Sequence, residues 1–135
     1  MVTTAPELKY YDVTKPMTIQ CDASSVGLGA TLMQEGQPIA FSSRALSIPE
    51  QGYAQIEKEC LAIVFACEKY DQYVCGKEKV QVESDHEPLE IIFKKPLYTA
   101  PKRLQSMLLR LQRYDLHIQY KPGKEMLIAD LLSRS

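Results

Sequence analysis

The 135-residue sequence has no tryptophan, only two histidines and no Cys-x-x-Cys pair among its four cysteines. Without such a pair, neither a zinc ribbon nor a disulfide-rich scaffold is expected. We expect reduced thiols, three of which (Cys60, Cys67 and Cys75) lie in one apolar helical stretch and should pack as small apolar side chains. No apolar run suggests a membrane span or a signal peptide. These absences favour a single cytoplasmic domain with no membrane partner.

Net charge is also nearly absent, because 16 basic and 17 acidic side chains leave −1. Such a balance gives no global attraction to nucleic acid. The distribution is uneven, however: residues 94–124 carry eight Lys or Arg side chains against one acid, Asp115, which makes this segment +7 and leaves −8 on the remainder. A segment of this kind can hold phosphates or can be the solvated face of a helix. Charge alone leaves both interpretations open.

Alternation of apolar and polar residues predicts five strands, at about residues 17–22, 29–34, 37–43, 80–84 and 116–120. Glu35 and Gly36 should form the tight turn between the second strand and the third, so the first three strands are expected to form an antiparallel meander. Residues 1–16, with prolines at 6 and 16, look like an incoming connector. The folded domain is therefore expected to cover residues 17–135.

Helical periodicity follows the meander. Ser47 is a good N-cap for a long helix that should run to Gly76. Further helices are expected at residues 88–93, 102–114 and 126–133. The resulting order predicts an α/β fold, in which a mixed five-stranded sheet is flanked by helices.

Four carboxylates stand at informative places in this order. Asp22 ends the first strand and Asp85 ends the fourth, while Glu59 lies in the first long helix and Asp130 opens the last one. If the first and fourth strands are neighbours, Asp22 and Asp85 emerge at one edge of the sheet. Crowded carboxylates repel one another unless cations lie between them, and such oxygen ligands suit Mg²⁺ or Mn²⁺. Spacing alone also allows ordinary caps and turn residues.

Four blocks of sequence stand in order along the chain: CDASSVGLGATLMQ, PIAFSSRALSIPEQGYAQIEKECLAIVFAC, VESDHEPL and APKRLQSMLLRLQRYDLHIQYKPGKEMLIADLLSRS. In these blocks, from about Pro6 to Ser135, the sequence resembles the ribonuclease H domain of reverse transcriptases from gypsy-like long-terminal-repeat retrotransposons. The resemblance implies a ribonuclease H-like fold. It also implies an endonuclease that hydrolyses the RNA strand of RNA–DNA hybrids and leaves 3′-hydroxyl and 5′-phosphate ends.

The resemblance places the acidic tetrad of the family on Asp22, Glu59, Asp85 and Asp130, which would hold two Mg²⁺ ions, with Mn²⁺ as a substitute. Glu59 is chosen over Glu57 because it directly precedes Cys60-Leu61-Ala62-Ile63, as the family's catalytic Glu precedes such a run. Glu57 is then the second choice and is expected to be solvated.

Two departures from the family pattern concern aromatic and imidazole side chains. Relatives usually have a histidine shortly before the last catalytic Asp, but His86 and His117 lie elsewhere. Tyr120, ten residues before Asp130, is carried over as an auxiliary catalytic residue, with packing on the sheet as the alternative. His86 either approaches metal or phosphate or makes a structural hydrogen bond, and His117 is expected to be packed. Met107 stands where many relatives have tryptophan.

Contacts to an RNA–DNA hybrid are expected from Ser24, Ser25, His86, Lys102, Arg103 and Arg110. The resemblance further implies a polymerase domain upstream and an integrase downstream in one polyprotein, acting in a cytoplasmic retroelement particle. Three alternatives stay open: an inactive or domesticated hybrid-binding module, a related nuclease or integrase on a similar fold, and a purely structural domain. A cleavage assay, the substrate preference and Mg²⁺ binding would distinguish these alternatives.

Overall fold

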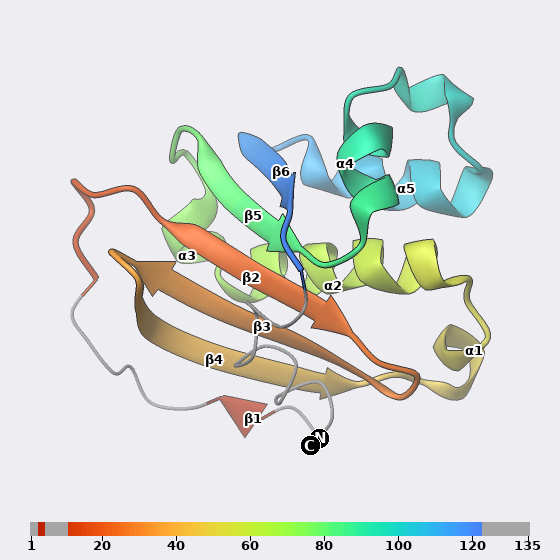
Figure 1. Ribbon diagram of the computed structural model, residues 1–135, viewed down its shortest axis with the longest axis horizontal. Coiled ribbons are helices and arrows are strands. Elements are labelled where there is room, and N and C mark those ends of the chain that lie inside the picture. Colours follow the sequence, from red (N-terminus) through yellow and green to blue (C-terminus); the bar gives the residue numbers. More distant parts are fainter. Residues whose placement is uncertain (1–2, 5–10, 123–135) are drawn as a thin grey trace.

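A mixed sheet forms the centre of the computed structural model, which describes residues 3–4 and 11–122 (Figure 1). It has six strands in the order β1-β4-β3-β2-β5-β6. The strands are β1 (Thr3–Thr4), β2 (Thr18–Ala23), β3 (Gly27–Gln34), β4 (Gln37–Ala45), β5 (Val80–Ser84) and β6 (Leu116–Tyr120). The five predicted strands are confirmed as β2 to β6. The two-residue strand β1 is an addition at the edge, and two residues are too few to show a periodicity.

The antiparallel meander is confirmed in β2, β3 and β4. Gln34 of β3 pairs with Gln37 of β4, so the loop between them is Glu35-Gly36. Both loop residues have positive φ, 52° and 74°. This left-handed backbone matches the twist of the two strands, and glycine adopts it without a steric penalty.

Parallel pairing places the ends of β2, β5 and β6 at one edge of the sheet. Cys21 of β2 pairs with Ser84 of β5, and Ser84 pairs in turn with Tyr120 of β6. Asp22 and Asp85, one residue further along, therefore leave neighbouring strands at the same edge. The expected adjacency of the two acids is confirmed.

The prediction of one long helix from Ser47 to Gly76 is wrong. Three helices occupy this stretch: α1 (Ile48–Gln51), α2 (Gln55–Lys69) and α3 (Asp71–Val74). Ser47 is an N-cap, as expected, and it forms a capping box with Glu50. A second helix start follows at once, because the N–H of Ala54 donates to Glu57 Oε1 at 2.8 Å. The chain therefore breaks at Gly52 and restarts with a new cap.

The remaining helices are α4 (Glu87–Phe93), the 3₁₀ turn η1 (Leu97–Thr99) and α5 (Lys102–Leu111). These confirm the helices predicted at 88–93 and 102–114, although α5 ends three residues early. The helix predicted at 126–133 lies outside the described residues. In the described part of the chain, no helix has the length and apolar character needed to cross a membrane.

The core forms between the sheet and α2, which packs on β2 and β3 and also contacts α5. Cys60, Cys67 and Met107 are buried in it, as expected. Two predictions fail at its margins. Cys75 is exposed because it follows the end of α3 instead of lying within a helix. His117 is exposed because β6 is an edge strand and its alternation turns this side chain to solvent.

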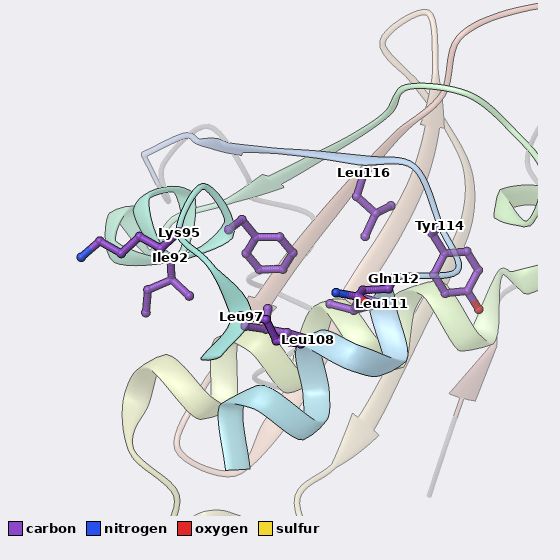
Figure 2. A pocket seen from close by; sticks show the side chains of 9 residues that line it. Ile92, Lys95, Leu97, Leu108, Leu111, Gln112, Tyr114 and Leu116 are labelled. Atoms are coloured by element: carbon purple, nitrogen blue, oxygen red, sulfur yellow. The ribbon is translucent and has the colours of Figure 1, made fainter. Parts of the chain in front are cut away.

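Figure 2 shows an apolar pocket of about 210 Å³ where α5 meets α4, η1 and β6. Leucines 108, 111 and 116 line it together with Ile92, and Lys95 and Gln112 supply polar groups. Asp22, Glu59 and Asp85 do not line this pocket. It belongs to the packing of α5 on its neighbours.

Candidate metal centre

Asp22, Glu59 and Asp85 come together at the edge where β2 and β5 end. One carboxylate oxygen from each lies within 4.8 Å of those of the other two, a grouping able to hold a metal ion. Asp22 is near the end of β2, Asp85 directly follows β5, and Glu59 is brought in by α2, which packs against β2 and β3. The structure thus unites three of the four acids proposed from the sequence. Asp130 lies outside the described residues.

Burial makes this grouping electrostatically costly. Asp22 and Glu59 are only 5% and 4% exposed, and Asp85 is half-buried. Burial, and after it the neighbouring charges of Asp22 and Asp85, raise the pKa of Glu59 to about 8, although hydrogen bonding to the Gln55 side chain and to the backbone of Ala23 lowers it in part. Without a cation, Glu59 therefore holds a proton at neutral pH.

The two oxygens of Glu59 have different environments. Oε2 accepts a hydrogen bond of 2.7 Å from Gln55 Nε2. Oε1 is buried and has no hydrogen-bond partner in the described part of the chain. A buried oxygen without a donor is costly, whereas a hard cation would satisfy it. The donor set therefore fits a divalent cation that prefers oxygen.

Tyr120 ends β6 at the same edge of the sheet. The residue is 38% exposed, and its backbone N–H donates to Glu90 Oε2 at 2.7 Å, which ties the end of β6 to α4. His86 is the N-cap residue of α4, and its N–H donates to Ser84 Oγ at 3.2 Å. Burial lowers the pKa of His86, and Asp85 partly opposes this.

Ser24 and Ser25 form the turn that follows β2. Ser24 Oγ accepts from the N–H of Gly27 at 3.0 Å, so it stabilises the turn. Ser25 is exposed beside it. Both serines therefore lie within three residues of Asp22, close in the chain to the carboxylate cluster.

The cations of α5 predicted to contact nucleic acid differ in their surroundings. Arg103 pairs with Glu57 at 3.2 Å, and its guanidinium lies 4.3 Å from the centre of the Tyr53 ring. Arg110 makes a bidentate pair with Glu68, in which Nη2 donates to Oε1 at 2.7 Å and Nε donates to Oε2 at 3.1 Å. Lys102 is exposed and makes no ion pair within residues 11–122.

The prediction that Glu57 is solvated is wrong. Its side chain is 14% exposed, because it caps α2 and pairs with Arg103 at the same time. The cap was readable from the sequence, since an acid three residues after a helix start is a common signal. The partner was not readable, because Arg103 lies on a distant helix.

Ion pairs also engage much of the rest of the basic segment. Arg113 pairs with Asp71, Lys121 with Glu83 and Lys94 with Glu90, at 3.7, 3.4 and 3.8 Å. Residues 94–124 therefore do more than form a solvated helix face or bind phosphates, because several of their charges are engaged in ion pairs within the domain. Their arginines also join α5 and the residues that follow it to α2 and α3.

Comparison with known proteins agrees with this architecture. A family model for the RNase H-like domain found in reverse transcriptase matches residues 12–114. The chain belongs to this family. The retrovirus-related Pol polyprotein from transposon gypsy of Drosophila melanogaster is 41% identical over 128 residues. That match covers 94% of this chain but 12% of the polyprotein, so the RNase H-like domain spans a small part of its relative.

Solved structures confirm the fold of the RNase H-like domain. LC11-RNase H1 in complex with an RNA/DNA hybrid superposes with a TM-score of 0.67 at 17% identity, covering 86% of this chain and 92% of that one. The foamy viral protease-reverse transcriptase in complex with an RNA/DNA hybrid gives 0.66 at 22% identity, covering 84% and 16%. The ribonuclease H-like fold predicted from the sequence is therefore confirmed.

Proposed function

We propose that this RNase H-like domain is an endonuclease that cuts the RNA strand of RNA–DNA hybrids during reverse transcription and leaves 3′-hydroxyl and 5′-phosphate ends. The observation that carries the proposal is the cluster of three carboxylates, in which the buried Oε1 of Glu59 has no hydrogen-bond partner among the residues that the structure describes. The matched family and the fold shared with ribonucleases H support the same reaction class.

Asp22, Glu59 and Asp85 would hold two Mg²⁺ ions together with Asp130, and Mn²⁺ could replace them. When bound, such ions supply a nucleophilic hydroxide near neutral pH and offset the charge that develops on the leaving 3′ oxygen. The protein contributes position: Asp22 and Asp85 are fixed by paired strands, and Glu59 by a packed helix. Glu59 gives up its proton when its carboxylate becomes a ligand.

Recognition of the hybrid would depend on shape and on phosphates. RNA is told from DNA through its 2′-hydroxyls in a wide, shallow minor groove. Ser24, Ser25 and His86 lie near the acids in the chain and are proposed as contacts, with Tyr120 as an auxiliary catalytic residue. On α5, Lys102 offers its charge to phosphate more readily than Arg103 and Arg110, which are engaged in ion pairs.

The proposed setting is a Pol polyprotein in a cytoplasmic retroelement particle. A polymerase domain would precede the domain, joined through residues 1–16, and an integrase would follow. The matched relatives are polyproteins of this kind. The last part of the proposed connector is held against the sheet, since the Asp12 N–H donates to Gln34 Oε1 at 2.8 Å and Lys15 pairs with Glu35 at 2.6 Å.

The test is cleavage of a hybrid whose RNA strand is labelled, with Mg²⁺ or Mn²⁺. We expect cuts in the RNA strand and none in double-stranded DNA. Asp85→Asn should lower the rate at least about a hundredfold, because it removes a charged ligand of the cluster. Glu78→Gln is the matched control, since Glu78 is exposed and lies away from the cluster along the chain. Hybrid binding without any cutting, even with the polymerase domain attached, would instead identify an inactive binding module.

A further inference from the structure

Gln55, the first residue of α2, makes a side-chain hydrogen bond to the metal-binding cluster. Its Nε2 donates to Glu59 Oε2 at 2.7 Å. The two residues are four apart, so they lie on one face of the helix about one turn from each other. The amide therefore reaches the carboxylate from the side of α2 itself.

We infer that Gln55 is a positioning residue for the cation site. This inference rests on the proposed function. By holding Oε2, the amide fixes the rotation of the Glu59 carboxylate and leaves Oε1, which has no hydrogen-bond partner in the described residues, as the oxygen available to a cation. One carboxylate oxygen each from Asp22, Glu59 and Asp85 lie within 4.8 Å of one another.

The turn that carries Gln55 is itself held in place. Glu57 accepts the N–H of Ala54 at 2.8 Å and pairs with Arg103 at 3.2 Å. The guanidinium of Arg103 also lies over the Tyr53 ring. The residues on both sides of Gln55 are therefore fixed to α5, which keeps its amide oriented before any cation arrives.

The effect expected on cation binding follows from the general behaviour of such hydrogen bonds. Partners that orient a metal ligand typically change metal affinity by 10- to 100-fold when they are removed. Gln55 is exposed, so its replacement leaves the core intact. The loss should therefore appear in cation affinity and leave folding unaffected.

The test uses Gln55→Met, which keeps the length of the side chain and removes its donor. Mn²⁺ binding to the protein without substrate is measured from the electron paramagnetic resonance signal of free Mn²⁺. We expect Mn²⁺ to bind at least about tenfold more weakly, with an unchanged unfolding temperature.

Two further variants serve as controls. Gln55→Ala should weaken Mn²⁺ binding as Gln55→Met does, and Gln72→Met, at an exposed glutamine of α3, should bind Mn²⁺ as the wild type does. Kinetically, kcat should recover at high Mn²⁺ while KM for the hybrid stays constant.

Equal Mn²⁺ affinity in the wild type and Gln55→Met would overturn the inference. A raised KM for the hybrid at unchanged Mn²⁺ affinity would overturn it too, because Gln55 would then act as a substrate contact. Failure of the proposed function gives a different result: the wild type would bind Mn²⁺ but would not cut the hybrid. The Mn²⁺ affinities of the wild type and Gln55→Met could still be compared in that case. A wild type that binds no Mn²⁺ would overturn both.

Discussion

At Glu59 two requirements oppose each other. Packing of α2 against β2 and β3 buries the side chain, whereas cation binding needs its charged form. The metal-free fold resolves this by keeping the proton, since burial raises the pKa to about 8 from an ordinary value of 4.5. The position of Glu59 therefore favours cation binding and lowers the stability of the cation-free fold.

This opposition predicts an unusual pH dependence in EDTA. Between pH 4.5 and pH 8 the folded chain keeps a proton on Glu59 that the unfolded chain has released, so the contribution of Glu59 to stability falls as the pH rises. The free energy of unfolding should therefore carry a loss on the order of 3 kcal/mol from this group by pH 8. Urea unfolding at pH 5 and pH 8 measures it, and Glu59→Gln should abolish this part of the difference. An identical pH dependence in both proteins would contradict it.

Single residues differed in how far the sequence revealed them. Asp22, Glu59 and Asp85 stood out because their positions in strand and helix matched a family pattern, and the structure places them together. Gln55 carried no such signal, because its role depends on a side-chain contact within one turn. Such a contact depends on rotamers that the burial of Glu59 selects, and the sequence does not display burial directly.

At the scale of elements, three ion pairs join α2 and α3 to α5 and to the residues just after it. We name them the arginine seam: Glu57–Arg103, Glu68–Arg110 and Asp71–Arg113, of which Arg113 lies two residues beyond the end of α5. The arginine side chains of the seam are more than half exposed. Exposed pairs stabilise by at most about 1 kcal/mol each and are screened by salt. The arginine seam therefore orients α5 and contributes little to the overall stability of the domain.

The arginine seam predicts that the cations of α5 differ in how much each contributes to hybrid binding. Lys102→Gln should weaken hybrid binding and reduce its salt slope by about one, as expected for the loss of one phosphate contact. Arg110→Gln should alter hybrid binding less, because Glu68 already holds that guanidinium, and should cost up to about 1 kcal/mol of stability at low salt. Fluorescence anisotropy with a labelled hybrid across a salt series separates the two. A larger effect from Arg110→Gln would show that the seam opens on binding.

Elements themselves were predicted unevenly. Strands β3 and β4 and their turn were readable because Glu35-Gly36 is a strong hairpin signal. The break between α1 and α2 was not, because apolar residues continue at helical spacing across Gly52 toward Ile56 and Cys60. The helix breaks here because two N-terminal caps, at Ser47 and at Ala54, each start a helix of their own. The periodicity of apolar residues does not reveal such a second start.

For the whole molecule, cation binding and folding should be coupled. The cluster exists only in the folded chain, so Mg²⁺ at 100 times its Kd should raise the free energy of unfolding by about 2.7 kcal/mol. Thermal unfolding with and without Mg²⁺ measures this, and Asp85→Asn should remove most of the gain. An equal gain in the variant would place the stabilising cation away from the cluster.

The global arrangement was predictable only in part. The antiparallel meander followed from local signals, but the parallel placement of β5 beside β2 depends on where α2 packs, which links residues far apart in the chain. The family resemblance supplied this link. It gave no sign of β1, the two-residue strand at the edge of the sheet.

That parallel pairing also has a consequence for synthesis on the ribosome. Asp22 emerges early, Glu59 later, and Asp85 only with the end of β5, and hydrogen bonds between β2 and β5 are needed to bring the first and last together. A nascent or truncated chain that lacks β5 therefore has no cation pocket.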